Sequence, residues 1–317
     1  MTKSTFWPAT VCVVSMVACG GSSHSVSTTT SIVPSSTATP TASSPAPTAV
    51  QSTAAATPAL LIEKDLATQT DTAYALDWSA DGQALAVASG VELTFLSNDL
   101  SETIAVLKPA SGAVAAAWNP ERDAIATVGG LRNKKISIWD WDSASGALTS
   151  QREVSAGSDQ FAVSWSPDGT RLATLADDRN SDIQIWDTSA WSMVGRYDLP
   201  YANPRRALIW SADGREIYDG GESGGQFVYF SVDVNDGSVR ELGGLSTESA
   251  SVFTVSPDAD KVAVADERGD VQIRELASGN LLFEFQAVDT PADMAWNPQG
   301  STLAILGYAT TLQLWSL

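Results

Sequence analysis

The chain repeats one sequence phrase six times between residue 72 and its last residue. Each copy has a short apolar strand, a polar turn, a strand rich in Ala and Leu, a polar loop and another apolar strand. The anchors at the end of the first strand are spaced by 40, 47, 45, 45 and 41 residues, and they are Trp78, Trp118, Trp165, Trp210, Val255 and Trp296. A period of about 40–45 residues with four short strands is typical of a propeller blade. The repeat therefore predicts an all-β fold, a six-bladed β-propeller.

The third copy shows the four strands most clearly. Its apolar runs predict strands at 161–165, 172–176, 183–187 and 193–197, with a Ser-Pro-Asp-Gly turn at 166–169 between the first two. The second strands at 84–88, 124–128, 172–176, 261–265 and 302–306 lack the alternation of apolar and polar residues that a half-solvated strand shows. We therefore expect these strands to be buried on both faces, between neighbouring blades.

The sixth copy ends inside its third strand, at 312–317, and has no fourth strand of its own. A spare apolar run, 60–65, precedes the first copy where a fourth strand belongs. Pairing the two runs would close the ring and remove an exposed sheet edge. We therefore predict that an N-terminal strand completes the last blade of a propeller spanning residues 59–317.

These residues resemble the WD-repeat family, through the polar turns after the anchors and through Ile138-Trp-Asp140 and Ile185-Trp-Asp187. The Gly-His pair of that family is missing, because the only histidine, His24, precedes the repeats. Phe95, Phe230 and Arg274 stand where the family places a second Trp. The chain thus looks like a divergent WD-repeat propeller, and the resemblance implies a rigid platform that binds other proteins.

The N-terminus has the features of an export signal. Lys3 precedes an apolar stretch from Phe6 to Ala18, which is too short to span a bilayer as a helix. The residues Val17-Ala18-Cys19-Gly20 resemble the lipobox of bacterial lipoproteins, in which the Cys is acylated and becomes the new N-terminus. This resemblance implies a lipoprotein signal peptide at 1–18 and lipidation of Cys19. Ordinary signal cleavage beside an incidental Cys is the alternative.

Residues 19–58 form a tether between this signal and the repeats. Of the 39 residues from 20 to 58, 24 are Ser, Thr or Pro, and none is Lys, Arg, Asp or Glu. Such a segment cannot bury enough apolar surface to offset the entropy of ordering it, so we predict disorder. At about 3.1 Å per residue, it could hold the propeller up to roughly 120 Å from a membrane.

The repeats carry 17 basic and 37 acidic residues, a formal charge of −20. A nucleic-acid ligand is excluded by this balance, because phosphate binding needs a basic surface. The repeats also contain neither His nor Cys. Ser-His-Asp and Cys-His catalysis and zinc sites built on those side chains are therefore excluded. We expect no enzymatic activity and no cofactor; carboxylate- or calcium-dependent hydrolysis in the axial channel is the alternative.

One weak metal candidate and two tryptophans remain. Asp178, Asn180 and Asp182 have the alternating oxygen ligands of a calcium loop, but the glycine and the final glutamate of that motif are absent. A solvated hairpin loop explains the segment better. Trp141 and Trp191 fall outside the repeat positions, near the turns between third and fourth strands, where packing at the rim is favoured over an exposed stacking platform.

Basic residues gather in loops that a propeller places on one face. The candidate partner-binding residues are Arg132, Lys134, Lys135, Arg179, Tyr201, Arg205 and Arg206. The alternative is a set of solvated loops paired with nearby aspartates. We predict a monomeric, membrane-anchored lipoprotein facing the periplasm or exterior that binds envelope or extracellular proteins, with small-molecule or carbohydrate binding in the axial channel as the other hypothesis.

Overall fold

The computed structural model describes residues 57–66, 72–110, 112–142, 145–176, 181–200, 207–224, 226–245 and 250–317. The predicted signal peptide and Cys19, and nearly all of the predicted tether, lie outside these residues. The described residues form 24 strands and no helix, arranged as six four-stranded antiparallel sheets. None of them belongs to a helix long and apolar enough to cross a membrane.

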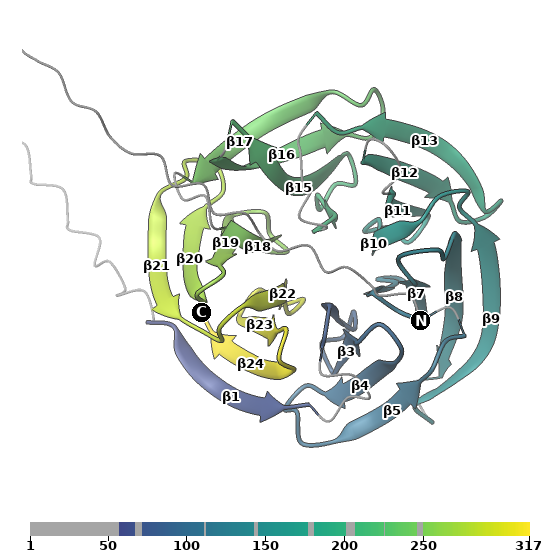
Figure 1. Cartoon of the computed structure of the whole chain (residues 1–317), viewed down its shortest axis with the longest axis horizontal. Helices are drawn as coiled ribbons and strands as arrows, with labels where there is room; N and C mark the ends of the chain where they lie inside the picture. The colour runs from purple at the N-terminus through teal and green to yellow at the C-terminus, as the bar shows by residue number, and fades with distance from the viewer. Residues whose placement is uncertain are drawn as a thin grey trace, which may run out of the picture. The chain divides into compact units, whose positions relative to one another are not determined.

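Each sheet is one blade of a ring, with its four strands a, b, c and d running from the axis outward (Figure 1). Blade 1 comprises β2 (Ala75–Trp78), β3 (Ala84–Ala88), β4 (Leu93–Ser97) and β5 (Thr103–Leu107), and blade 2 comprises β6 (Ala115–Trp118), β7 (Ala124–Val128), β8 (Lys135–Asp142) and β9 (Ala147–Ser155). Blade 3 comprises β10 (Gln160–Trp165), β11 (Arg171–Ala176), β12 (Asp182–Asp187) and β13 (Ser192–Asp198). Blade 4 comprises β14 (Ile209–Trp210), β15 (Glu216–Ser223), β16 (Gln226–Asp233) and β17 (Val239–Leu245). Blade 5 comprises β18 (Ala250–Val255), β19 (Lys261–Asp266), β20 (Asp270–Glu275) and β21 (Leu281–Gln286). Blade 6 comprises β22 (Pro291–Trp296), β23 (Thr302–Gly307), β24 (Thr311–Ser316) and β1 (Ala59–Asp65). The six-bladed prediction is confirmed, and the four strands of the third copy match within one residue at each end.

The first strand of the ring is also the outer strand of the last blade. β1 pairs antiparallel with β24, from Ala59 opposite Ser316 to Asp65 opposite Thr311 (Figure 1). Side chains reinforce the ladder, because Gln313 Nε2 donates to Glu63 Oε2 at 2.6 Å. The predicted closure by an N-terminal strand is confirmed.

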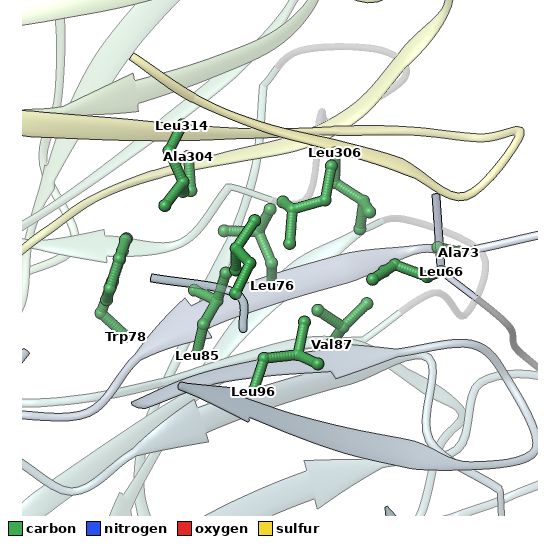
Figure 2. Close-up of a cluster of buried hydrophobic side chains, with 12 residues drawn as sticks. Leu66, Ala73, Leu76, Trp78, Leu85, Val87, Leu96, Ala304, Leu306 and Leu314 are labelled. Carbon is green, nitrogen blue, oxygen red and sulfur yellow. The ribbon is translucent and has the colours of Figure 1, made fainter. Parts of the chain in front are cut away.

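Six separate hydrophobic clusters hold the ring together, one at each interface between neighbouring blades. Figure 2 shows the cluster between blades 6 and 1, where Leu306 and Leu314 face Leu76 and Leu85. The b strands are the centre of this packing: every residue of β3 and β7 is buried, as expected for strands covered on both faces. Each blade therefore buries its apolar surface only against its neighbours.

The tryptophan anchors connect the innermost strands of adjacent blades. Trp78 Nε1 donates to the Ala295 carbonyl at 3.2 Å, and Trp165 Nε1 donates to the Ala117 carbonyl at 3.1 Å. Trp210 repeats the contact in blade 4. In each case the acceptor comes from the residue just before the anchor position of the preceding blade. These three anchors are thus both core side chains and hydrogen-bond donors across the blade interface, whereas the indole N–H groups of Trp118 and Trp296 have no partner among the described residues.

The polar turn after each anchor has a structural role of its own. In blade 3, Ser166 Oγ donates to Asp168 at 2.6 Å and accepts from the Arg171 backbone N–H at 2.9 Å. The serine hydrogen bond holds the pKa of Asp168 below its usual value. Gly169 closes the turn at φ +63°, a conformation that glycine adopts without strain. The same Ser-to-Asp hydrogen bond occurs in blades 1, 4 and 5. The motif therefore stabilises the turn of the a–b hairpin.

Candidate functional site

The two faces of the ring differ in which connections they carry. Because successive strands are antiparallel, the b–c and d–a connections lie on one face, called here the loop face. The a–b and c–d turns lie on the other, called here the turn face. Two backbone bridges join connections on the loop face, Gly90 with Ala113 and Gly130 with Gln160. These bridges fasten the b–c connections of blades 1 and 2 to the start of the next blade.

A pocket of about 450 Å³ opens on the loop face. It is formed by blades 1, 2, 3 and 6 and lined by Tyr74, Ala75, Val114, Ala115, Gly129, Gly130, Leu131, Phe161, Ala292, Asp293 and Tyr308. Three of its apolar side chains are unusually exposed: Tyr74 at 41%, Tyr308 at 46% and Leu131 at 77%. Tyr74 and Tyr308 meet edge to face, with ring centroids 6.5 Å apart. Exposed aromatic and aliphatic side chains around a concavity are typical of a binding site.

Backbone contacts fix the connections that carry these side chains. The Tyr308 N–H donates to the Thr290 carbonyl at 3.1 Å, and Ala73 donates to the Tyr308 carbonyl at 3.4 Å. Gly130 has φ +72°, and a side chain there would come within 3.1 Å of Val114. The glycine thus lets the b–c connection of blade 2 run close to blade 2's own first strand and present Leu131 to solvent. Backbone hydrogen bonds thus hold the connections at Tyr308 and Ala73 in place at the pocket rim.

The pocket leads toward a smaller cavity on the ring axis, of about 250 Å³, lined by the a strands of all six blades. The two spaces share Ala75, Ala115 and Asp293. Asp293 Oδ2 accepts from the Leu76 N–H at 2.9 Å, which joins blade 6 to blade 1. Asp77 Oδ2 accepts from the Trp118 N–H at 2.7 Å, which joins blade 1 to blade 2.

These two axial carboxyls have altered acidity. Removal from bulk water raises the pKa of Asp77 and of Asp293 to about 7, against the lowering effect of the backbone N–H groups that each accepts. Asp293 adds a further upward contribution to the pKa of Asp77 through charge repulsion. Both side chains keep partial contact with solvent in the cavity although protein surrounds them. Carboxyls of this kind can exchange a proton near neutral pH.

The predicted basic sector is only partly within the described residues. Arg132 follows Leu131 at the pocket rim and is exposed, and its backbone N–H donates to Asp159 Oδ2 at 2.9 Å. Lys134 is exposed nearby, whereas Lys135 pairs with Glu153 at 2.5 Å. The structure thus places Arg132 and Lys134 on the loop face. Four predicted members lie outside the described residues: Arg179, Tyr201, Arg205 and Arg206.

Two of the three weak metal candidates, Asp178 and Asn180, also lie outside the described residues. The third, Asp182, is fully buried at the start of β12 and accepts from Arg196 Nη2 at 2.6 Å. Across the described ranges, no three His, Cys, Asp or Glu side chains are grouped as metal ligands would be.

The two tryptophans outside the repeat pack at the rim, as favoured from the sequence. Trp141 is 9% exposed, stacks on Phe95 at 4.7 Å and meets Trp118 edge to face at 5.3 Å. Trp191 meets Trp165 in the same way at 6.2 Å. Neither side chain is an open stacking platform.

Sequence reasoning missed the residues that form the pocket and its floor. Tyr74, Leu131 and Tyr308 come from connections far apart in the chain, which no spacing rule brings together. The axial carboxyls had a readable signal, because charged residues interrupt otherwise apolar a strands. Asp77 precedes its anchor where the other copies have Ala, Ser, Ile, Thr and Ala, and Asp293 occupies a position that is Ala or Val elsewhere.

Comparisons with known proteins agree with the architecture. No protein-family model matches the chain, and no curated protein matches it. Among solved structures, it is similar to the β-propeller domain of Cps50 (Swd1) from Myceliophthora thermophila, with a TM-score of 0.62 and 12% sequence identity. The match covers 81% of this chain and 99% of that domain. At this identity the likeness concerns the fold alone, and it agrees with the β-propeller architecture of the chain.

Proposed function

We propose that this protein is an exported, lipid-anchored propeller that binds another envelope or extracellular protein through its loop face. The observation that carries the proposal is the 450 Å³ pocket bordered by exposed Tyr74, Leu131 and Tyr308. Side chains of this type are enriched where proteins bind one another. The rigid hydrogen-bonded connections beneath them favour a preformed surface, which lowers the entropic cost of association.

The pocket proposal predicts a position-specific cross-link. A photo-reactive amino acid at Leu131 or Tyr308 should cross-link one partner protein in intact membranes, because both side chains border the pocket. The matched control is Val106, which is 50% exposed on the outer strand β5. Cross-linked products should be resolved by gel electrophoresis and mass spectrometry. Identical products from all three positions, or none from the pocket positions, would contradict a loop-face partner.

Lipid anchoring is proposed from Val17-Ala18-Cys19-Gly20, which lie outside the described residues. The mature protein should begin at an acylated Cys19 and partition into detergent. A Cys19→Ser form should accumulate unprocessed or be cleaved elsewhere. Mass spectrometry of the mature N-terminus provides the measurement, and a soluble wild type with an unmodified Cys19 would refute anchoring.

A second function is favoured by one observation, the axial Asp77 and Asp293 with pKa values raised to about 7. A carboxyl with this acidity suits general acid or base catalysis on a small ligand. A ligand of the axial cavity should raise the melting temperature of wild type, by the mass action that binding to the folded state produces. It should have no such effect on Asp77→Asn/Asp293→Asn. This assay distinguishes axial ligand binding from partner binding at the loop-face rim.

A further inference from the structure

A third cavity, of about 400 Å³, lies on the turn face between blades 1 and 2. It is lined by Ser79, Ala80, Asp81, Gln83, Ala84, Ile104, Trp118, Asn119, Pro120, Glu121, Arg122, Asp123 and Trp141. The a–b turn of blade 1 forms one side, and the anchor and turns of blade 2 form the other. The site shares no residue with the loop-face pocket or the axial cavity.

The equivalent positions at the next two blade interfaces are filled by arginine. Arg122 of blade 2 lies over the Trp165 ring of blade 3, with Cζ 5.3 Å from its centroid. Arg171 of blade 3 lies over the Trp210 ring of blade 4, at 5.0 Å. A guanidinium over an indole is attracted by the negative ring face. At these two interfaces, each blade thus supplies a cation to the anchor of its successor.

Blade 1 supplies no such cation to Trp118. Counted from the anchors, the position of Arg171 corresponds to Ala84, and that of Arg122 corresponds to Gly82. Trp141 meets Trp118 edge to face in the same way as Trp191 meets Trp165, and Phe95 also meets Trp118 edge to face, at 5.7 Å. The indole N–H of Trp118, like that of Trp296, has no hydrogen-bond partner among the described residues, although only 7% of Trp118 is exposed. A guanidinium only donates hydrogen bonds, so it would contact the ring of Trp118 and not this N–H.

The charges around the cavity favour a cation. Asp81, Glu121 and Asp123 all line it, and none of them forms an ion pair with a described residue. One oxygen of Asp81 accepts from Ser79 Oγ and the Gln83 N–H, and no hydrogen bond from a described residue occupies its other oxygen. The one basic residue in the lining, Arg122, lies over Trp165 instead.

We propose that this cavity binds a basic side chain, an arginine, presented by a partner protein. The bound guanidinium lies beside Trp118, as Arg122 lies over Trp165, and the carboxylates of Asp81 and Asp123 compensate its charge. Planar guanidinium groups suit this combination of an aromatic face and carboxylates better than the compact ammonium of lysine. The tether at 19–58 contains no Arg or Lys, so it cannot supply the occupant.

The test uses the full chain, labelled with nitrogen-15, and follows the indole N–H resonance of Trp118, assigned by its loss in Trp118→Phe. The probe is acetyl-Gly-Arg-Gly-amide, and the matched peptide replaces arginine by uncharged citrulline. We expect a saturable shift with the arginine peptide and an affinity for the citrulline peptide lower by roughly fivefold or more. Equal responses to the two peptides, or no saturable shift with the arginine peptide, would overturn the proposal.

Two variants test the location. Ala84→Arg places an arginine where Arg171 stands in blade 3, so it should fill the cavity and abolish the peptide-induced shift. Ala84→Gln adds bulk without charge and should preserve part of the response. If Ala84→Arg fails to fold, Asp81→Asn/Asp123→Asn serves instead, since both changes lie in exposed turns, and it should weaken binding by roughly fivefold or more. An unchanged affinity in that variant would contradict the site.

Discussion

Deleting residues 59–66 is expected to abolish the single cooperative unfolding transition of the propeller. The deletion removes β1, leaves the full length of β24 as an unpaired edge and takes Leu66 from the cluster between blades 6 and 1. An open edge also invites pairing with other molecules, so we expect aggregation at high protein concentration. Urea unfolding followed by tryptophan fluorescence, together with light scattering, measures both effects.

Two controls separate ring closure from a general effect of shortening the chain. Deleting residues 22–56 should leave the transition nearly unchanged, because that segment lacks the composition to contribute to a core. Adding the peptide of residues 59–66 to the deleted protein should restore part of the lost cooperativity. Equal destabilisation by the two deletions would show that β1 has no special role in closing the ring.

Raising the pH from about 4 to about 8 is expected to destabilise the folded protein, with Asp219 as a main contributor. Its side chain is fully buried on β15, and desolvation raises its pKa from 3.8 to about 7. Between these values the folded state holds a proton that the unfolded state has lost. Stability from this group is therefore complete below pH 3.8 and is lost as the pH rises through about 7.

The variant Asp219→Asn should remove the pH-dependent loss of stability and keep both hydrogen bonds to the side chain. Oδ1 accepts from both the Gly220 and Ala207 N–H groups, at 2.7 and 3.3 Å, whereas Oδ2 has no partner among the described residues. An amide can therefore keep both contacts. The free energy of unfolding of Asp219→Asn should exceed that of wild type by an amount that grows with pH, to at most about 4 kcal/mol. This difference corresponds to roughly 8–16 °C in melting temperature.

Asp213→Asn is the matched control for Asp219→Asn. Asp213 lies in the exposed turn of the same blade, and its hydrogen bond from Ser211 lowers its pKa. The pKa of Asp213 is lowered, whereas that of Asp219 is raised, so ionised Asp213 stabilises the fold. Asp213→Asn should therefore be slightly less stable than wild type at neutral pH, and the difference in stability should vanish in acid. Calorimetry at several pH values compares the two variants. Parallel curves for wild type and Asp219→Asn would refute the assigned role.

The repeat made the architecture predictable because the copies share the same pattern of apolar strands and turn-forming residues. Ser166, Asp168 and Gly169 illustrate this, since their hydrogen bonds and backbone angle define a hairpin regardless of what surrounds it. Closure by residues 60–65 was predictable by counting strands. The length of each strand and the pairing of Trp indoles with the preceding blade depend on packing between blades, which the order of residues in one blade does not reveal.

The candidate sites were less predictable because they arise between copies. Tyr74 and Tyr308 are separated by more than 200 residues in the chain and meet only when blades 6 and 1 are joined. The basic residues were predicted to gather on one face, and two of them, Arg132 and Lys134, lie on the loop face. Lys135 instead forms a local ion pair with Glu153. Asp77 and Asp293 are positions where one copy departs from the others, and such departures indicate the axial cavity in the sequence itself.

The pairing of β1 with β24 also sets the order of events in folding. β1 is the first strand of the ring to be synthesised, and its hydrogen-bond partner is the last, about 250 residues later. Blades 1 to 5 can form from neighbouring segments while synthesis continues, but β1 must wait until β24 exists. A chain interrupted before β24 therefore leaves a free apolar strand at its start, so late truncations should be recognised by quality-control proteases as readily as early ones.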